Sequence, residues 1–503
     1  MTATPEPIDL LLSYEKNDAS RAYGAPVERI ASRQRDIYII SDLHLASGKG
    51  IGGTFNGLEN FFYDASFKRF LRHAEKTRYG KGALLVINGD FIDFLRIADV
   101  PVEEHEFEEW RGALERTGIS KTNEELRRAV SPKERAYGFK TQEYKALWRL
   151  LIAMKGHPEF MSALVEWLLS GNEIVIVKGN HDLEWYWPGV RNYFRMALAD
   201  RVRDLKKINI IECLRDIVLP RVLFADNAVE VDSTLYIEHG HRYDRYSHVA
   251  GPALLKNRKE LNLPFGSFFN RYLINRIELI YPFIDNVRPR ENLLPLLFKE
   301  HFFLGCRVLF QHVPFTLKMV PKSYFRYMFA RLLPYMAPII FLIVAAIVSS
   351  VLFLKNGPGA GHGAIDFFST TIGGLIANPL KIVAWTIASY FFTRVVAYFQ
   401  LVEPDTLAEN AGDLFDKSNG YRYIVFGHTH NPDQKIWGER RFWNSGTWIP
   451  MIEFSNAQVR IDKTFTFVHF APGPSGALVP DELQHWNDDA GRAEPMAIVE
   501  GKP

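Results

Sequence analysis

Five short polar motifs along the chain are rich in carboxylate and imidazole groups. They are Ser41-Asp42-Leu43-His44, Gly89-Asp90, Gly179-Asn180-His181-Asp182, Glu238-His239-Gly240-His241 and Gly427-His428-Thr429-His430. Their side chains supply the oxygen and imidazole donors that divalent first-row metals accept, and none supplies the thiolate ligands of a structural zinc site. The motifs therefore predict a centre that can hold two metal ions.

Each motif begins where a short run of β-branched or aromatic residues ends. These runs predict strands at residues 37–40, 83–87, 173–177, 235–237 and 423–426. Side chains just beyond strand ends converge on one edge of a sheet, which is the usual place for a site in layered α/β proteins. We therefore expect an α/β fold with all five motifs at one sheet edge.

Other segments predict the elements that surround this sheet. Residues 103–169 are charged and helix-rich, and their amphipathic end, 160–169, leads through a turn into the 173–177 strand. Further strands are predicted at residues 441–443, 451–454, 458–461 and 465–470. Asn444 and the following Ser445-Gly446-Thr447 predict a plain turn close to the last motif.

Size and composition exclude several classes of protein. With 503 residues, the chain exceeds one typical core and suggests roughly two to four domains, or one domain with large insertions. Its 60 Lys and Arg nearly balance 58 Asp and Glu, so no nucleic-acid partner is expected. Cys213 and Cys306 lie outside metal-like spacing and fit a reducing compartment.

The two ends of the chain are predicted to be irregular. Residues 1–35 lack the apolar core of a secretory signal, so we expect a flexible segment that starts in the cytoplasm. Residues 471–503 contain Pro, Gly and acidic residues and predict a loose polar tail.

Residues 247–335 differ from the rest because basic side chains alternate with Phe, Tyr and Leu while acidic residues become sparse. One interpretation is a helical cap on a membrane surface, where aromatic rings occupy the interface and basic groups meet anionic head groups. The other is a soluble helical insertion with solvated charges.

Two apolar runs follow and favour the membrane interpretation. Residues 336–354 carry no charge and, at about 1.5 Å per residue, span roughly 28 Å, which predicts a transmembrane helix. The second run, 373–392, contains Pro379 and Lys381 and either crosses or is re-entrant or interfacial. Because the motifs before and after these two runs must meet in one site, the chain has to cross the membrane an even number of times: twice or not at all. Flanking basic residues, such as Arg394, place the core on the cytoplasmic side.

In identity and order, the five motifs resemble the calcineurin-like metallophosphoesterase superfamily, whose pattern is Asp-x-His, Gly-Asp, Gly-Asn-His-Asp/Glu, His and Gly-His-x-His. The resemblance covers residues 36–246 and 420–470. It implies an α/β fold, a four-layer β-sandwich flanked by helices, to which this chain adds a helical, membrane-associated insertion. The expected division is 1–35, 36–246 (first part of the core), 247–335 (cap), 336–400 (membrane hairpin), 401–470 (second part of the core) and 471–503.

The resemblance also implies the role of each ligand. The first metal would be bound by Asp42, His44 and His430, the second by Asn180, His239 and His428, and Asp90 would bridge both. The bridging carboxylate would hold two divalent ions, Mn, Fe, Co or Zn, close together despite their repulsion. A water shared between them would lose a proton near neutral pH, and the resulting hydroxide would attack phosphorus.

Four further residues complete the candidate site. By resemblance, His181 faces the substrate and stabilises the transition state or protonates the leaving oxygen, and Asp182 could orient it. Asp93 either fixes a ligand from behind or is a plain acid at the start of a helix. Spacing does not decide between His239 and His241 as ligand; the resemblance favours His239, with His241 lining the pocket.

The predicted substrate is a phosphorylated small molecule or a lipid-linked or nucleotide-linked phosphoester or pyrophosphate. The Ser-Asp-Leu-His-Leu opening and the helical insertion are distantly similar to UDP-2,3-diacylglucosamine pyrophosphohydrolases. Those enzymes carry Arg where this chain has His181, and their insertion is shorter. The alternatives are a tethered phosphodiesterase or protein phosphatase with soluble substrates, and a non-catalytic scaffold with the same fold.

Overall fold

The computed structural model describes residues 6–18, 27–50, 52–280, 286–288, 301–307, 315–316, 318, 406–418, 420–455, 458–463 and 465–496. The chain divides into two compact units, Met1–Leu317 with Pro404–Pro503, and Lys318–Glu403. The candidate site and every helix and strand given below lie in the first unit.

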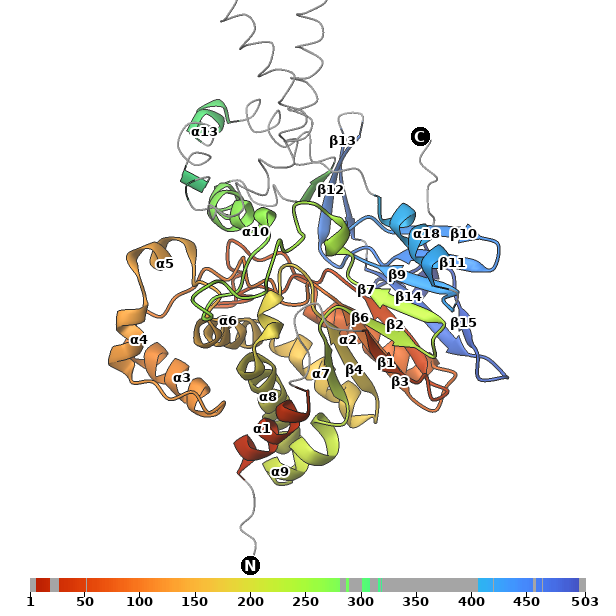
Figure 1. Cartoon of the computed structure of the whole chain (residues 1–503), viewed down its shortest axis with the longest axis horizontal. Helices are drawn as coiled ribbons and strands as arrows, with labels where there is room; N and C mark the ends of the chain where they lie inside the picture. The colour runs from red at the N-terminus through yellow and green to blue at the C-terminus, as the bar shows by residue number, and fades with distance from the viewer. Residues whose placement is uncertain are drawn as a thin grey trace, which may run out of the picture. The chain divides into compact units, whose positions relative to one another are not determined.

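The larger sheet has eight strands among the described residues, in the order β17-β16-β14-β2-β3-β4-β5, with β15 paired to β14 (Figure 1). Four neighbouring strands are parallel: β2 (Asp36–Ile40), β3 (Ala83–Asn88), β4 (Glu173–Val177) and β5 (Val222–Ala225). β2 and β3 are buried along their whole length, because both faces of this sheet are covered. The predicted strands 37–40, 83–87 and 173–177 are therefore confirmed.

The second sheet has six described strands in the order β1-β6-β7-β9-β11-β10. They are β1 (Glu28–Ile30), β6 (Ala228–Val231), β7 (Leu235–Glu238), β9 (Tyr423–Phe426), β11 (Arg440–Asn444) and β10 (Asp433–Trp437). β7 and β9, which precede the last two motifs, are parallel neighbours. The motifs thus follow strands of two sheets, and the expectation of a single sheet edge is wrong.

Alternating residues of β2 show how the layers pack. Ile37 and Ile39 face the second sheet and share an apolar core with Ile237 and Val425. Tyr38 and Ile40 point to the opposite face, where they belong to the helix-covered core. Because successive strand residues face opposite sides, one strand serves both cores.

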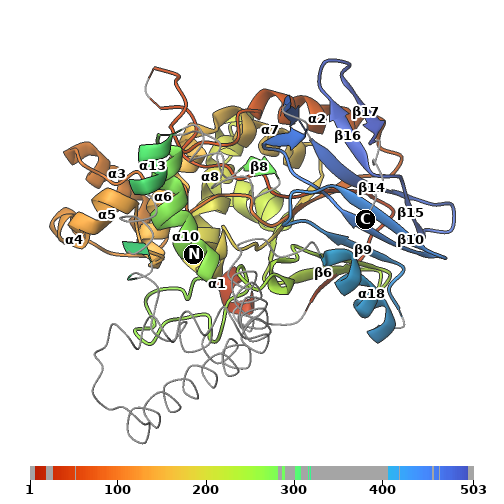
Figure 2. The ribbon, with the colours of Figure 1, turned by 90° about the horizontal axis from the view of Figure 1, so that it is seen from above.

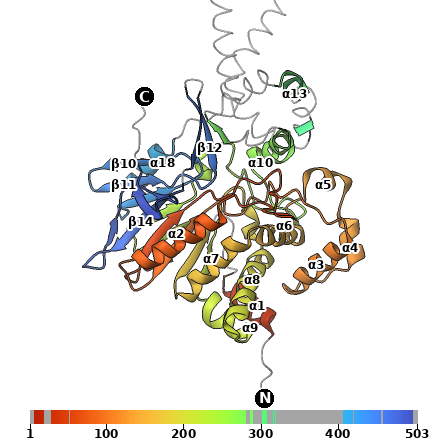
Figure 3. The ribbon, with the colours of Figure 1, turned by 180° about the vertical axis from the view of Figure 1, so that it is seen from behind.

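Helices cover the outer faces of both sheets. α2 (Asp64–Thr77) and α7 (Pro158–Leu169) lie side by side on the larger sheet (Figure 3), and α8 (Pro188–Lys206) belongs to the same core. α18 (Leu407–Lys417) packs on the smaller sheet (Figure 2). The described part of the first unit is therefore a mixed α/β fold of helices, sheet, sheet and helix.

The helix-rich segment before β4 is confirmed. Its helices are α3 (Glu104–Glu115), α4 (Asn123–Ala129), α5 (Pro132–Tyr137), α6 (Glu143–Gly156) and α7. The starts of α4 and α5 have complete capping boxes, in which Thr122 pairs with Glu125 and Ser131 with Glu134. These reciprocal hydrogen bonds satisfy N–H groups that the first helical turn leaves unpaired.

Both ends of the chain contain more regular structure than expected. Within residues 1–35, α1 (Pro7–Asp18) buries Leu11, and β1 pairs in parallel with β6. In the predicted tail, β14 (Thr466–Pro472) is followed by β15 (Leu478–Pro480), β16 (Gln484–Asn487) and β17 (Arg492–Pro495). The flexible N-terminal segment and the loose tail are wrong for these residues. Isolated apolar side chains such as Leu11, Leu483 and Trp486 stabilise both ends by packing into the cores.

The described parts of residues 247–335 are mainly helical. α10 (Phe265–Phe269), a π-helical turn (Asn270–Ile274) and α11 (Asn275–Glu278) form one continuous segment, here called the 265–278 segment. α13 (Phe302–Arg307) follows, and β8 (Val287–Arg288) forms a three-stranded sheet with β12 (Pro450–Ser455) and β13 (Gln458–Lys463).

The two apolar runs, 336–354 and 373–392, lie outside the described residues. Among the helices that the structure does describe, none combines the length and the apolar composition needed to cross a bilayer.

Candidate metal centre

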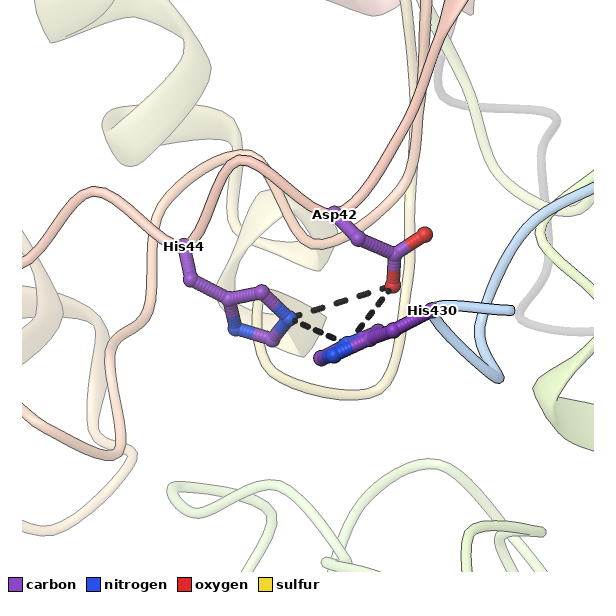
Figure 4. A group of neighbouring side chains, drawn as sticks. All are labelled: Asp42, His44 and His430. Carbon is purple, nitrogen blue, oxygen red and sulfur yellow. Dashed lines mark hydrogen bonds and ion pairs between the residues drawn. The ribbon is translucent and has the colours of Figure 1, made fainter. Parts of the chain in front are cut away.

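The first and last motifs meet, although they lie almost four hundred positions apart in the sequence. Asp42 Oδ1 lies 3.3 Å from His430 Nε2 and 3.8 Å from His44 Nε2. The two imidazole nitrogens are 3.0 Å apart, and Figure 4 shows the three side chains converging. A divalent cation accepts donors in this arrangement, so these residues form the first candidate ligand set.

The second and third motifs meet His239 in a neighbouring set. His239 Nε2 lies 3.2 Å from Asn180 Oδ1 and 3.2 Å from Asp90 Oδ2. Potential ligand atoms of Asp90, His239 and His428 all lie within 4.8 Å of one another. Asp90 Oδ2 is also 3.8 Å from His44 Nε2, so the Asp90 carboxylate borders both ligand sets.

Unpaired buried atoms show that the side chains fit metal ions. Among the described residues, Asp42 Oδ1 and His428 Nδ1 are buried and have no hydrogen-bond partner. An unsatisfied buried polar atom costs about 1–3 kcal/mol, so such atoms are rare in folded proteins. A cation in each ligand set would give each of these atoms a partner, and the mixture of carboxylate, imidazole and amide donors suits Mn, Fe, Co or Zn.

Backbone strain is concentrated at the ligands. Five of them have left-handed φ angles: Asp42 (54°), His44 (49°), Asp90 (51°), His428 (73°) and His430 (60°). Each such residue costs on the order of 1–3 kcal/mol and persists where the surrounding structure imposes it, typically at functional sites. The strain turns the chain sharply at the strand ends and directs the side chains of both Asp-x-His and His-x-His to one point.

Two motif glycines are required by close approach. A Cβ on Gly179 would overlap the Asp90 carboxylate, and one on Gly427 would overlap the side chains of Ser41 and Asp42. Any larger residue would displace a ligand. This packing explains why glycine precedes the functional residue in both motifs.

A single carboxylate supports two histidines. Asp93 Oδ2 lies 2.9 Å from His44 Nδ1 and 2.9 Å from His181 Nδ1. These contacts fix both ring orientations and place Nε2 of His44 toward the first ligand set. Of the two interpretations of Asp93, the structure therefore supports the one in which it fixes a ligand.

Asp182 contacts other groups. It accepts hydrogen bonds from the backbone N–H of Gly179 (2.6 Å), the backbone N–H of Phe91 (2.9 Å) and Trp185 Nε1 (3.0 Å). Asp182 thus ties the third motif to the loop after Asp90. The expectation that it orients His181 is corrected, because Asp93 occupies that position.

The histidines of the second set are oriented by different groups. His239 Nδ1 donates to the carbonyl of Asn88 (2.8 Å), which leaves Nε2 to face Asp90 and Asn180. His428 Nε2 lies 2.9 Å from Asp244 Oδ2, which leaves Nδ1 as its ligand atom. Sequence reasoning missed Asp244, although it stands three residues after His241, just as Asp93 stands three residues after Asp90.

His241 lies beside the set without joining it. Its ring centroid is 5.5 Å from that of His239, and it belongs to none of the potential metal groups among the described residues. Burial and the neighbouring His239 and His428 lower the pKa of His241 well below its usual value. The geometry thus separates the two histidines that spacing does not distinguish: His239 belongs to a group that could hold a metal ion, and His241 lies beside that group.

The turn after β11 braces the first and last motifs. Thr447 Oγ1 donates to the backbone carbonyl of Asp42 (2.7 Å), and Ser445 Oγ lies 2.8 Å from Ser41 Oγ. Asn444 Nδ2 donates to Thr429 Oγ1 (2.8 Å). The predicted plain turn therefore has a structural role in holding the ligand loops together.

Charges within the centre complement one another. Burial opposes the charged form of His44, yet contacts with Asp42 and Asp93 raise its pKa to about 10. His239 is likewise buried, and Asp90 and Asp42 raise its pKa to about 9. Although burial alone would raise them, the pKa values of Asp42, Asp90 and Asp93 fall below the usual range because of the surrounding histidines. The carboxylates are therefore ionised and available as ligands at neutral pH.

Asp182 differs from the buried aspartates that border the two ligand sets. Burial and the nearby Asp90 carboxylate raise the pKa of Asp182 to about 7. Its environment thus differs from that of the ligand carboxylates, although it belongs to the same motif as Asn180.

Comparison with known proteins found no matching family model, no matching curated protein and no matching solved structure.

Proposed function

We propose that this chain is a dimetal phosphoesterase, related to the calcineurin-like metallophosphoesterases, that hydrolyses a phosphoester or pyrophosphate bond. The observation that supports this most is the position of Asp90 between two sets of metal-type donors. Two ligand sets that share one carboxylate suit a two-metal site, which stabilises both the attacking and the leaving oxygen of an in-line displacement. Structural metal sites, in contrast, are usually isolated and thiolate-rich.

The proposed ligands are Asp90 and the six residues that the motifs place around it. Asp42, His44 and His430 would hold one ion and Asn180, His239 and His428 the other. Bound divalent ions would supply a water of lowered pKa and would stabilise negative charge on the phosphoryl oxygens.

His181 belongs to a further potential metal group with His44 and Asp90, but in our proposal it acts as a catalytic residue and not as a ligand. Its Nδ1 is held by Asp93, so the orientation of the ring is fixed before substrate arrives. Its Nε2 has no hydrogen bond to any described residue, and in our proposal it donates a proton to the leaving oxygen or stabilises the phosphoryl group. The side chain is only 15% exposed, which limits competition from water.

The proposed substrate is lipid-linked or nucleotide-linked, and the proposed location is a membrane with the core on its cytoplasmic side. The basic and aromatic composition of residues 247–335 and the apolar runs that follow support this. Phe303, in α13, is 86% exposed, as expected for a residue at an interface with lipid. A tethered enzyme with soluble substrates would need the apolar runs as its anchor but not a cap that contacts lipid.

A metal-dependent screen tests the proposal. Purified protein, stripped with chelator and reloaded with Mn²⁺, is assayed against phosphomonoesters, phosphodiesters and nucleotide-linked lipids in detergent. We expect turnover only in the reloaded protein, and we expect Asp90→Ala to abolish it. Efficiency should be higher on the lipid-linked substrates than on a small chromogenic diester.

The matched control is Asp36→Asn. Asp36 is as buried as Asp42, but it contacts His469 (2.9 Å) at the far end of β2 from the ligands. This variant should keep its metal and its activity. Wild-type turnover in purified Asp90→Ala would refute the dimetal role. Equal efficiency on lipid-linked and small substrates would refute only the lipid assignment.

A further inference from the structure

Arg96 lies between the metal centre and the insertion. Its Nε is 3.3 Å from Asp93 Oδ2, and its Nη2 is 3.2 Å from Glu278 Oε1, while Nη1 forms a second ion pair with the same carboxylate. The side chains of Arg96 and Glu278 are each only 2% exposed. The forked contact restricts the guanidinium to one orientation, as bidentate pairs do.

The 265–278 segment turns a polar face toward the core. Arg271, Asn275 and Glu278 are spaced four and three residues apart, so they share one side of the helix, and all three are buried. Arg271 donates to the carbonyls of Gly138 and Phe139, and Asn275 Nδ2 donates to that of Leu95 (2.8 Å). Burying polar groups is costly unless they find partners, and this face finds them in two loops, one with Gly138 and Phe139 and the other with Leu95 and Arg96.

Asp93 is the point at which this contact enters the centre. One carboxylate oxygen, Oδ2, faces His44, His181 and Arg96 Nε, while Oδ1 accepts from the backbone N–H of Leu95 (3.1 Å). Three donors around one oxygen leave it a single position. The guanidinium adds a charged donor to the two imidazoles at Oδ2, while the backbone N–H groups of Leu95 and Arg96 hold Oδ1.

We propose that Arg96 is a positioning residue for the metal centre and that Glu278 of the insertion completes it. Glu278 fixes Arg96, Arg96 fixes Asp93, and Asp93 fixes the rings of His44 and His181. The insertion thereby supports the site through a buried chain of contacts. This inference rests on the proposed dimetal function.

The test is a charge-neutral double variant, Arg96→Met with Glu278→Met. The double variant removes one positive and one negative charge. A change in metal affinity would therefore reflect the positioning of the ligands rather than a change in net charge near the centre. Buried ion pairs can often be replaced by apolar residues without loss of stability. Isothermal titration of the metal-free protein with Mn²⁺ should show affinity about tenfold lower or worse, as for other residues that support metal ligands. The melting temperature in chelator should stay near that of the wild type.

The control double variant is Lys145→Met with Glu134→Met. Lys145 Nζ lies 2.6 Å from Glu134 Oε1, and this pair is also buried, but neither residue touches a described side chain of the centre. We expect wild-type Mn²⁺ affinity in this variant even if its melting temperature falls. Arg96→Lys keeps a cation but loses the fork, so its affinity should fall between those of the wild type and the Arg96 and Glu278 double variant.

Kinetics provide a second readout. With bis(4-nitrophenyl) phosphate and saturating Mn²⁺, the Arg96 and Glu278 double variant should have a lower kcat at an unchanged KM, because His181 loses its support.

Wild-type Mn²⁺ affinity and kcat in this variant would overturn the proposal, and so would equal losses in the control. If the double variant does not fold, Arg96→Lys and Glu278→Gln decide by the same two measurements. Failure of the wild type to bind Mn²⁺ is a separate result, and it refutes the proposed function itself.

Discussion

The two halves of the candidate metal centre are supported in different ways. In the first half, His44 is oriented by Asp93, which also holds His181 and is itself held by Arg96. In the second half, a backbone carbonyl orients His239 and a separate carboxylate, Asp244, orients His428. In the first half, one carboxylate thus supports both a proposed ligand and the proposed acid, whereas the second half draws on Asn88 at the end of β3 in the larger sheet and on Asp244 in the loop after β7.

This difference predicts unequal responses to mutation. Loss of the shared carboxylate of Asp93 should disturb both metal binding and catalysis. Asp93 orients the proposed ligand His44 and the proposed acid His181 together. Loss of a separate support should disturb one ligand only. The bridging Asp90 borders both halves, so the effect of its substitution should resemble the loss of support in neither half.

The largest effect is expected from Asn180→Ala, which removes a ligand of the second half alone. Purified protein should retain one of two Mn²⁺ equivalents, as measured by elemental analysis, and should show no turnover, because both ions are needed. Asn172→Ala is the matched control: Asn172 is also buried, but it donates to Glu75 and accepts from Ala83. Two retained equivalents with normal turnover would remove Asn180 from the ligand set.

His181→Ala should separate chemistry from binding. Because His181 is held by Asp93 but is not a proposed ligand, both Mn²⁺ equivalents should remain. The kcat should fall by about 10²–10⁴, the usual contribution of a general acid or base. Elemental analysis and steady-state kinetics on the same preparation give both values. Loss of metal in this variant would instead identify His181 as a ligand.

Asp93→Asn and Asp244→Asn compare the two kinds of support directly. Both substitutions remove one negative charge from a group that contacts a ligand histidine, but Asp93 contacts two rings and Asp244 one. Variants of such supporting groups typically lose about 10–100-fold in metal affinity, and we expect Asp93→Asn near the upper end and Asp244→Asn near the lower. Mn²⁺ titration measures both. An equal or reversed order would break the comparison between the halves.

The smallest effect concerns His157, which lies outside the centre. Its Nδ1 is 2.8 Å from Asp64 Oδ1 and its Nε2 is 3.2 Å from Glu59 Oε2, and although burial opposes the charged form, these contacts raise its pKa to about 9. A raised pKa stabilises the fold fully below about pH 6.5 and progressively less as pH rises through 9. The free energy of unfolding should fall by up to about 3 kcal/mol across that window.

Urea denaturation of the metal-free protein between pH 6.5 and 9.5 measures this loss. His157→Gln, which cannot titrate, should flatten the dependence on pH over the same window. Identical slopes for the wild type and the variant would show that the buried imidazole does not govern stability there.

Much of the centre could be predicted from the sequence because its proposed ligands follow strands with a clear apolar pattern. In these strands, apolar residues either alternate with polar residues or form a continuous run. The strands before the five motifs, β2, β3, β4, β7 and β9, lie where the apolar runs place them. The pattern could not show that these strands belong to two sheets, because strand partners are set by long-range pairing that leaves no local signal.

Other features depend on packing between distant segments. The sequence gives no indication that Asp244 approaches His428 or that Asp93 supports His181, because both contacts arise from loops that meet only in the folded chain. The strands near the C-terminus were missed for a related reason. Trp486 and Leu483 are isolated apolar residues in a polar segment, and their burial depends on neighbours far away in the sequence.

The central claim is that one carboxylate joins two metal ions, and electron paramagnetic resonance of the Mn²⁺-loaded protein tests it most directly. Two Mn²⁺ ions bridged by Asp90 should give a spin-coupled spectrum at two equivalents per chain, and Asn180→Ala should convert it to the six-line spectrum of a single ion. A six-line spectrum in the fully loaded wild type, or saturation at one equivalent, would contradict the account.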